Sequence, residues 1–447
     1  MTWTNWAGDE SCRPAVVAQP GSVDELSDVV ARATAAGRTA RAAGAGHSFG
    51  DLVPTSGVIV SLDGLGGVLS VDTAAGLARV AAGTRLRDLN VLLAAHGLAL
   101  ANLGDIDRQS VGGAMSTATH GTGRRLGNLA TQIEALDIVL ADGSLLAVTA
   151  DDPEILRAAR VSIGALGIIA SYTLRVVPAF RLRCEHHAAP LEETIAGLDE
   201  AVDGNDHYEF FIFPHAGQAW TKATNRTSEP AVSRGRLSRY VNDIVVENRL
   251  LDGLCRLGRA WPRLIPRLNR LITGLASDSV RIDDSYQIFP SVRDVRFTET
   301  EWALPRAACA GALRDMLAMI ERRRFDVNFP LEVRFVAADE ESFLSPSYGR
   351  ETAYIAAHMY RGMEWAPYFT AVQEIALAYD GRPHWGKRHS LGAGDLAPRY
   401  PAWDRFQAVR TRLDPAGRFT NEHVRRVLGA VDAATHKGGS NVQHRIG

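Results

Sequence analysis

The chain has 447 residues, with 49 Lys+Arg against 51 Asp+Glu and a formal net charge of -2. This length exceeds what one hydrophobic core usually organises, so two domains with a cleft between them are expected. The balanced charge, without a basic block, excludes the electrostatic pattern of a nucleic-acid binder, so a small molecule is the expected partner.

The cysteines and the N-terminus exclude further classes. Cys12, Cys184, Cys255 and Cys309 lie far apart without a CxxC pair, which argues against a metal site, an iron–sulfur cluster or a disulfide framework. The first residues lack the basic and apolar segments of a secretory signal. No apolar run approaches the roughly 20 residues of a membrane-spanning helix. An intracellular protein is expected, either cytoplasmic or peripheral on a membrane.

The first ~178 residues mix strands with a few helices. The capping box Ser22-Val23-Asp24-Glu25 predicts a helix ending near Gly37, and leucine spacing predicts another over 86–93. Asp142-Gly143 is a hairpin turn signal. Strands are predicted at 39–42, 57–62, 69–71, 77–81, 133–140, 145–148 and 168–177. The connection lengths favour an α+β domain over regular βαβ repetition, with a boundary near Pro178.

The remainder is predicted to form a second domain over 179–429 and a flexible tail over 430–447. The C-terminal segment of the second domain is expected to pack back on the first domain, 1–178. Its predicted elements are helices at 191–201 and 368–379, strands at 208–213, 332–337 and 354–359, and an Arg-rich amphipathic stretch at 249–275.

Two glycine-rich loops lie in the first domain. In the loop 41–51, glycines allow backbone N–H groups to converge on phosphate oxygens, although a GxG sequence is also common in tight surface turns. The loop does not fit the Rossmann fingerprint, because position 49 is not glycine and Asp51-Leu52-Val53-Pro54 cannot begin a long helix. The second loop, 109–123, is rich in glycine and small hydroxyl residues. Two such loops could bind both ends of a large dinucleotide.

These loops carry a family resemblance. Gly44-Ala45-Gly46-His47-Ser48, Thr119-His120-Gly121-Thr122-Gly123 and the segment 162–168 together resemble the FAD domain of vanillyl-alcohol-oxidase-type flavoproteins. The chain is most similar to the aldonolactone oxidoreductases and to alditol oxidase, from Trp6 to about Leu428. The resemblance implies a two-domain α+β flavoprotein, with a PCMH-type FAD-binding domain and a substrate (cap) domain built on an antiparallel sheet with helices.

The resemblance also implies how FAD is held. A lone histidine beside a glycine turn is usually a polar surface residue, but in the family the matching histidine, here His47, bonds covalently to the 8α carbon of the flavin. Ala114 falls near the reactive face of the flavin, where alditol oxidase has a serine, so a substrate hydrogen bond from this position is in doubt. The implied cofactor-binding residues are His47, Ala42, Ala43, Gly44, Ala45, Gly46, Ser48, Ser110, Ala114, Thr119, Gly121, Thr122, Gly123 and Ile168.

Charged and aromatic residues in the second half suggest a substrate site. Glu332 and Arg334 share one face of a predicted strand, which would ordinarily be a surface ion pair on an edge strand. His358 would ordinarily be a satisfied core histidine, and His384-Trp385-Gly386-Lys387 a surface loop. The resemblance instead implies catalytic roles for Glu332, Arg334, His358 and Lys387. The implied substrate-binding residues are Ala114, Glu332, Arg334, Tyr360, His384 and Lys387.

The implied reaction is oxidation of L-gulono-1,4-lactone at C2 toward an ascorbate-type product, with hydride passing to flavin N5 and electrons to dioxygen or a cytochrome c-like carrier. His358 is the expected base, Lys387 and Arg334 supply positive charge, and Glu332 holds a hydroxyl and orients Arg334. His384 is typical of aldonolactone enzymes, whereas alditol oxidase has arginine there. The alternatives are an alditol or carbohydrate oxidase, a sugar-nucleotide oxidoreductase with noncovalent FAD, and a noncatalytic flavin-binding electron-transfer protein. The last of these would not need the charged residues Glu332, Arg334, His358 and Lys387.

Overall fold

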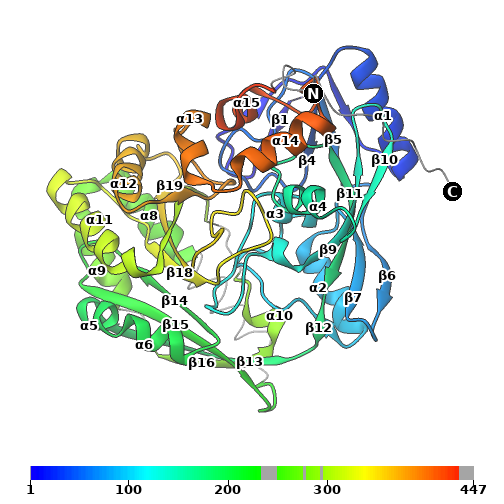
Figure 1. Cartoon of the computed structure of the whole chain (residues 1–447). Helices are drawn as coiled ribbons and strands as arrows, with labels where there is room; N and C mark the ends of the chain where they lie inside the picture. The colour runs from blue at the N-terminus through cyan, green and yellow to red at the C-terminus, as the bar shows by residue number, and fades with distance from the viewer. Residues whose placement is uncertain (1, 233–248, 275–277, 292–294, 432–447) are drawn as a thin grey trace.

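The computed structural model describes residues 2–232, 249–274, 278–291 and 295–431 (Figure 1). The predicted tail, 430–447, lies outside the described residues except for its first two positions. Within the described part of the chain, no helix combines the length and apolar character that crossing a membrane requires.

The described residues of the first part form two larger sheets and two strand pairs. The parallel sheet has the order β3 (Val16–Ala18), β5 (Val58–Ser61) and β4 (Ala40–Ala43). The antiparallel sheet has the order β10 (Leu145–Val148), β9 (Ile133–Val139), β11 (Ile168–Arg175), β7 (Leu77–Ala81) and β6 (Val68–Asp72). The helices of this part are α1 (Val23–Ala35), α2 (Leu86–Ala95), α3 (Val111–Ser116) and α4 (Pro153–Arg160).

Local signals placed several of these elements correctly. The Ser22 side chain accepts a hydrogen bond from the Glu25 backbone N–H at 3.1 Å and caps α1 as predicted. Gly143 adopts a φ of 87° in the turn between β9 and β10, which confirms the predicted hairpin. The predicted strand 168–177 ends earlier, because Val177–Pro178 forms a separate strand, β12, with β8 (Leu98–Ala99).

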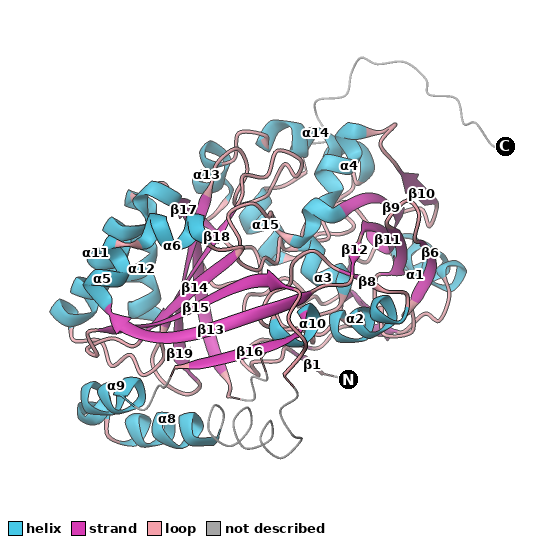
Figure 2. Cartoon of the chain, turned by 90° about the horizontal axis from the view of Figure 1, so that it is seen from below, coloured by secondary structure: helices cyan, strands magenta, loops and turns pink. Residues whose placement is uncertain are grey.

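The second part is built on one eight-stranded antiparallel sheet. Its order is β16 (Ser279–Asp284), β13 (Arg181–Pro190), β15 (Gln218–Thr227), β14 (His207–Ile212), β18 (Leu331–Val336), β19 (Thr352–Tyr360), β17 (Phe297–Pro305) and β20 (Arg382–Pro383). Helices α5 (Leu191–Ala196), α6 (Leu198–Gly204), α11 (Cys309–Arg323) and α12 (Ala366–Ala378) gather on the side of this sheet away from the first part (Figures 1 and 2). The segment predicted as one helix, 191–201, forms the two helices α5 and α6, which are separated at Gly197.

Burial explains the apolar runs of this sheet. All residues of β18 and β19, and eight of the nine in β17, are buried. β18 lies between β14 and β19, so Glu332 and Arg334 are on a central strand and not on an edge strand. Charged residues in such a strand must be paired, because burying an isolated charge is costly.

The Arg-rich stretch forms two helices, α8 (Leu251–Ala260) and α9 (Ile265–Gly274), separated near Pro262. The short helices α10 (Ser285–Ile288) and α13 (Ala393–Leu396) connect other elements.

After α14 (Trp403–Leu413), the chain returns to the first part at α15 (Glu422–Leu428). Asn421 caps α15 and donates through its Nδ2 atom to backbone carbonyls of Asp51, Leu52 and Pro54. The C-terminal segment thus holds the loop that follows the first glycine-rich sequence.

Candidate active site

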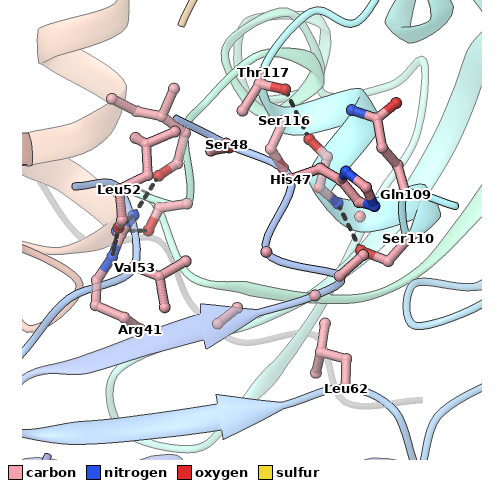
Figure 3. Close-up of a pocket in the computed structure, with 18 of the residues that line it drawn as sticks. Arg41, His47, Ser48, Leu52, Val53, Leu62, Gln109, Ser110, Ser116 and Thr117 are labelled. Atoms are coloured by element: carbon pink, nitrogen blue, oxygen red, sulfur yellow. Dashed lines mark hydrogen bonds between the residues drawn. The ribbon is translucent and has the colours of Figure 1, made fainter. Parts of the chain in front are cut away.

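Both glycine-rich loops line one large pocket in the first part (Figure 3). It encloses about 920 Å³, including space open to solvent. It is lined by residues 44–48, by six residues of 109–117, and by Gly164 and Gly167. The imidazole of His47 projects from its loop into this pocket.

Glycine is required where the two loops meet. A Cβ on Gly44 would lie 2.0 Å from the Ser110 Oγ atom, so no larger residue fits unless Ser110 moves. Gly46 has a φ of 68°, a conformation that L side chains rarely adopt. Arg41, which is 4% exposed, donates to the backbone carbonyls of Leu52 and Ile163 and so ties the first loop to the segment 162–168. The pocket is therefore a preformed cradle for an elongated ligand.

Half of the implied FAD residues line this pocket, namely Ala42, Gly44, Ala45, Gly46, His47, Ser48 and Ser110. Thr119 instead lines a second pocket, and Gly121 and Thr122 a small third one. Ala43, Ala114, Gly123 and Ile168 line none of the three pockets, although Gly167 and Ile169 on either side of Ile168 line the first. Ala114 is fully buried in α3.

The second pocket joins the first at His47 and Ser48. It lies on one face of the eight-stranded sheet, where strand pairing places Glu299 opposite His358 and both Glu301 and Glu332 beside Ala356. The polar and charged residues that line it are His47, Ser48, Asp105, Gln109, Thr117, Thr119, His120, Glu299, Glu301, Glu332, Arg334, His358, His384 and Lys387. All four predicted catalytic residues therefore meet in one pocket beside His47.

Lys387 lies between two glutamates of β17. Its Nζ atom is 2.5 Å from Glu299 Oε2 and 3.8 Å from Glu301 Oε2. Burial alone would raise the pKa of Glu301, but His120 and Lys387 hold that pKa well below its ordinary value. The ammonium group is thus held between two carboxylates in the second pocket.

His358 has two distinguishable ring nitrogens. Nδ1 lies 2.9 Å from the Pro330 carbonyl oxygen, which can only accept, so Nδ1 carries a proton. Nε2 faces Glu299 Oε1 at 3.6 Å. In neutral His358, Nε2 is therefore the nitrogen able to take a proton, and Glu299 stands ready to stabilise the resulting charge.

Arg334 is surrounded by carboxylates. Its guanidinium pairs with Asp105 at 2.7 Å, with Glu209 at 2.8 Å and with Glu332. Burial opposes its charge, but these carboxylates raise the pKa of Arg334 well above its ordinary range. Lys222 pairs with Glu209 at 2.6 Å. Arg334 is therefore not the freely available cation that the sequence suggested, because three acidic groups already balance it.

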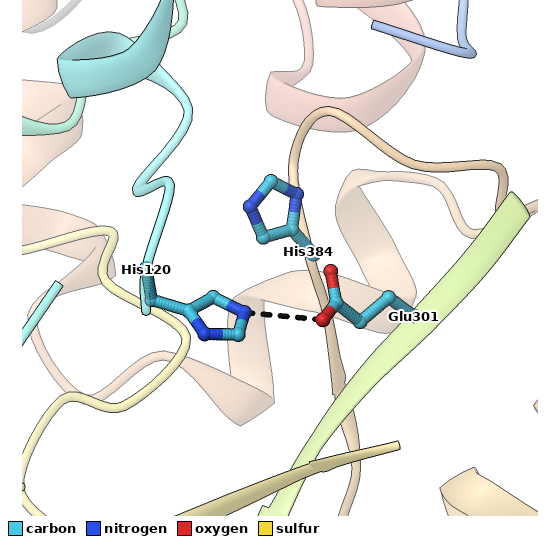
Figure 4. Close-up of side chains that lie close together, drawn as sticks. All are labelled: His120, Glu301 and His384. Carbon is cyan, nitrogen blue, oxygen red and sulfur yellow. Dashed lines mark hydrogen bonds and ion pairs between the residues drawn. The ribbon is translucent and has the colours of Figure 1, made fainter. Parts of the chain in front are cut away.

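His120, Glu301 and His384 form a buried group at the inner end of the pocket (Figure 4). Two histidines and a carboxylate could in principle hold a metal. However, His384 Nδ1 accepts a hydrogen bond from the Gly386 N–H at 3.0 Å, and the same ring is hydrogen-bonded to the Ala118 backbone. The Nδ1 atom of His384 is therefore already engaged, and this histidine joins its own loop to the second glycine-rich loop.

Sequence reasoning missed Glu299, Glu301 and His120 as pocket residues. Glu299 and Glu301 alternate with Thr298 and Thr300 along a buried strand, as Glu332 and Arg334 alternate along β18, and that pattern could have identified them. The implied substrate residue Tyr360 does not line the pocket. Its hydroxyl donates to Asp252 of α8 at 2.7 Å.

The comparisons with known proteins identify the family of this chain. The family model for D-arabinono-1,4-lactone oxidase matches residues 172–427, and the FAD binding domain model matches residues 14–149. The chain belongs to the D-arabinono-1,4-lactone oxidase family. Its members among the relatives found include lactone dehydrogenases and oxidases, so the chain is an FAD-dependent oxidoreductase, and the predicted family and α+β fold class are confirmed.

Similarity to individual family members extends over nearly the whole chain. L-gulono-1,4-lactone dehydrogenase of Mycobacterium tuberculosis is 48% identical over 96% of this chain and 99% of the relative. L-gulonolactone oxidase of Bos taurus is 33% identical over 96% of this chain and 98% of the relative. Alditol oxidase of a Streptomyces species is 32% identical over 95% of this chain and 98% of the relative. Cholesterol oxidase from Brevibacterium sterolicum has the same fold, with a TM-score of 0.82 at 20% identity over 96% of both chains.

The residues present fit the FAD of this family. The first pocket is lined by Gly44, Gly46, Gly112 and Gly113, where no side chain keeps a phosphate away from the backbone, and by Gly164 and Gly167. His47, at the junction of the pockets, is where the isoalloxazine would meet the substrate.

Proposed function

We propose that this chain oxidises a neutral aldonolactone, L-gulono-1,4-lactone or a near relative, at the C2 hydroxyl toward an ascorbate-type product. The observation that carries this proposal is the pocket of carboxylates, histidines and Lys387 that opens onto the flavin cradle at His47. The 48% identity to a lactone dehydrogenase over nearly the full length supports the choice of substrate.

Each side chain has a role that its surroundings support. When bound, FAD supplies the hydride acceptor for the reacting C–H bond. His358 takes the hydroxyl proton at Nε2, and Glu299 stabilises the imidazolium. Lys387 supplies positive charge where negative charge develops. Glu332 accepts a hydrogen bond from a second hydroxyl and fixes Arg334.

The charge of the pocket supports a neutral substrate. Asp105, Glu299, Glu301 and Glu332 can only accept hydrogen bonds when ionised, which suits a molecule rich in hydroxyl groups. An open-chain aldonate would add a further negative charge among them. The lactone is therefore expected to bind in preference to its hydrolysed acid.

Anaerobic flavin bleaching tests the proposal. L-Gulono-1,4-lactone and L-galactono-1,4-lactone should bleach the flavin faster than xylitol, and L-gulonate should be inert. Lys387→Met should slow bleaching by about tenfold or more while FAD loading is unchanged. Arg32→Met on exposed α1 is the control. Faster bleaching by xylitol would favour alditol oxidation, the activity in the name of the 32% identical Streptomyces relative.

Four finer points belong to the same proposal. We propose that His47 carries FAD covalently, that the domains divide near Pro178, and that the protein is cytoplasmic or peripheral on the membrane. The electrons go to dioxygen or to a cytochrome c-like carrier. Reoxidation of the reduced enzyme in air, compared with reoxidation by cytochrome c under argon, distinguishes the two acceptors.

A further inference from the structure

The N-terminal residues form a small hairpin against the His47 loop. β1 (Trp3–Thr4) pairs with β2 (Ser11–Cys12), which leaves residues 5–10 as the connecting loop. The Trp6 N–H donates to the Gly46 carbonyl at 2.8 Å, and the Asn5 side-chain amide donates to the Ser48 carbonyl at 3.2 Å. The backbone is therefore pinned on both sides of His47.

The hairpin also contacts the His47 ring. The Trp6 indole stacks on the imidazole, with ring centroids 5.2 Å apart and an interplanar angle of 27°. Phe49 and Phe297 pack edge-on against the same indole, with centroids 6.3 Å and 5.7 Å away. Trp6 thus has a fixed orientation and covers one face of the imidazole, which restrains the plane of the His47 ring.

The loop that presents Trp6 is rigidly held. The Asn5 Oδ1 atom accepts hydrogen bonds from the backbone N–H groups of Gly8, Asp9 and Glu10. Arg388, next to Lys387 in the chain, pairs with Asp9 at 2.7 Å and with Glu10 at 2.9 Å. Arg388, the neighbour of the pocket residue Lys387, therefore holds in place the hairpin that covers His47.

We propose that Asn5 and Trp6 are positioning residues that hold the His47 imidazole at the angle required for attack on the flavin 8α carbon. This proposal rests on the proposed covalent attachment. In that attachment an imidazole N–H bond and a methyl C–H bond break and an N–C bond forms. The isoalloxazine takes up the two protons and two electrons, and dioxygen then reoxidises it with release of hydrogen peroxide.

The protonation state of His47 is compatible with this role. Burial, with smaller effects from Arg85, Lys387 and Arg108, lowers the pKa of His47 to about 4. The ring is therefore neutral at pH 7 and has an unprotonated nitrogen for bond formation. What remains for the protein to supply is orientation, and a misplaced reacting group can cost a large factor in rate.

The test measures acid-stable flavin and not turnover. The holoenzyme and its variants are purified in air, and the flavin retained in the acid precipitate is divided by the total flavin. Trp6→Leu should keep its total flavin per chain, while the covalent share falls about five- to tenfold. Trp6→Phe retains an aromatic face and should keep most of the covalent share. The matched control is Trp261→Leu, at an indole that is 59% exposed.

Three outcomes would overturn the inference: a Trp6→Leu covalent share equal to that of the parent protein, a loss of total and covalent flavin in the same proportion, or a parent protein without acid-stable flavin. If Trp6→Leu fails to fold, the comparison of Trp6→Phe with Asn5→Ala decides, because Asn5→Ala should lower the covalent share and Trp6→Phe should not. Lactone bleaching is measured on the same samples. A parent protein that holds acid-stable flavin but is not bleached by lactones would count against the proposed reaction alone.

Discussion

The Nε2 atom of His120 lies 3.1 Å from Oε1 of Glu301, and this contact joins the second glycine-rich loop to the sheet that carries the catalytic residues. The Nδ1 atom of His120 lies 2.8 Å from the Gly121 carbonyl oxygen and must donate to it. The Tyr354 ring stacks on this imidazole, with centroids 3.6 Å apart. The pair is a buried histidine–carboxylate contact between the cofactor side and the substrate side.

Replacing Glu301 with glutamine should affect both stability and catalysis. The variant leaves His120 and Lys387 without their shared carboxylate, and breaking a buried pair in this way typically costs about 3–5 kcal/mol. We expect a lower melting temperature and a flavin reduction rate reduced by about tenfold or more at unchanged FAD content. The control is Glu192→Gln, whose exposed pair with Arg314 should contribute little. Wild-type reduction kinetics in Glu301→Gln would rule out a role for this contact in catalysis.

Removing Arg334 should expose the repulsion among its partners. Arg334→Met leaves Asp105, Glu209 and Glu332 close together without their common cation, so we expect a loss of about 3–5 kcal/mol in the free energy of unfolding. Adding Glu209→Gln removes one of those charges and should restore part of the loss. Thermal unfolding of the single and double variants measures this coupling. Strictly additive losses would mean that the carboxylates do not act through Arg334.

Gly44→Ala should prevent normal FAD loading. Its Cβ would fall 2.0 Å from the Ser110 Oγ atom, at the point where the two loops approach. We expect the flavin-to-protein ratio to drop several-fold, and the additional change Ser110→Gly to restore part of it. Gly66→Ala is the matched control, because a Cβ there meets no atom within 4 Å. Full flavin content in Gly44→Ala would show that the loops can separate without loss of binding.

Buried neutral histidines should make the protein sensitive to mild acid. Burial lowers the pKa of His384 from an ordinary value of 6.5 to about 3, so between these values the unfolded chain binds a proton that the folded chain does not. The stability linked to His384 is complete above about pH 6.5 and is lost as the pH falls toward 3. We expect melting temperatures to fall over this range, and to fall less steeply in His384→Gln. An identical pH dependence in both proteins would contradict this assignment.

The cofactor side of the protein was largely predictable from sequence. The requirement for glycine at position 46 is local, because it arises from a backbone dihedral angle, whereas the requirement at Gly44 arises from the approach of Ser110 and is tertiary. The helix cap at Ser22 and the hairpin turn at Gly143 are also local, and both predictions were confirmed. Ala114 was harder to place, because resemblance alone does not reveal which face of a short buried helix meets the pocket.

The substrate side was only partly predictable. Alternation along β18 gave the shared face of Glu332 and Arg334, and the same reasoning applied to β17 would have given Glu299 and Glu301. The pairing of Arg334 with Glu209 could not be inferred, because it depends on the register between β14 and β18, strands more than a hundred residues apart in the chain. The contact between Trp6 and His47 was likewise invisible, because neither residue's neighbours in sequence indicate it.

The sequence by itself determined the glycine turn at Gly46 beside His47 and the acidic and basic residues at alternating positions of buried strands, since both properties follow from short-range backbone geometry. Only the tertiary structure decided which charges balance each other. It brought Lys387 between Glu299 and Glu301, gave Arg334 three carboxylates, and placed Trp6 on the His47 ring. Coulombic and stacking interactions depend on distances of a few ångströms, and those distances are set by strand register and loop packing between residues remote in sequence.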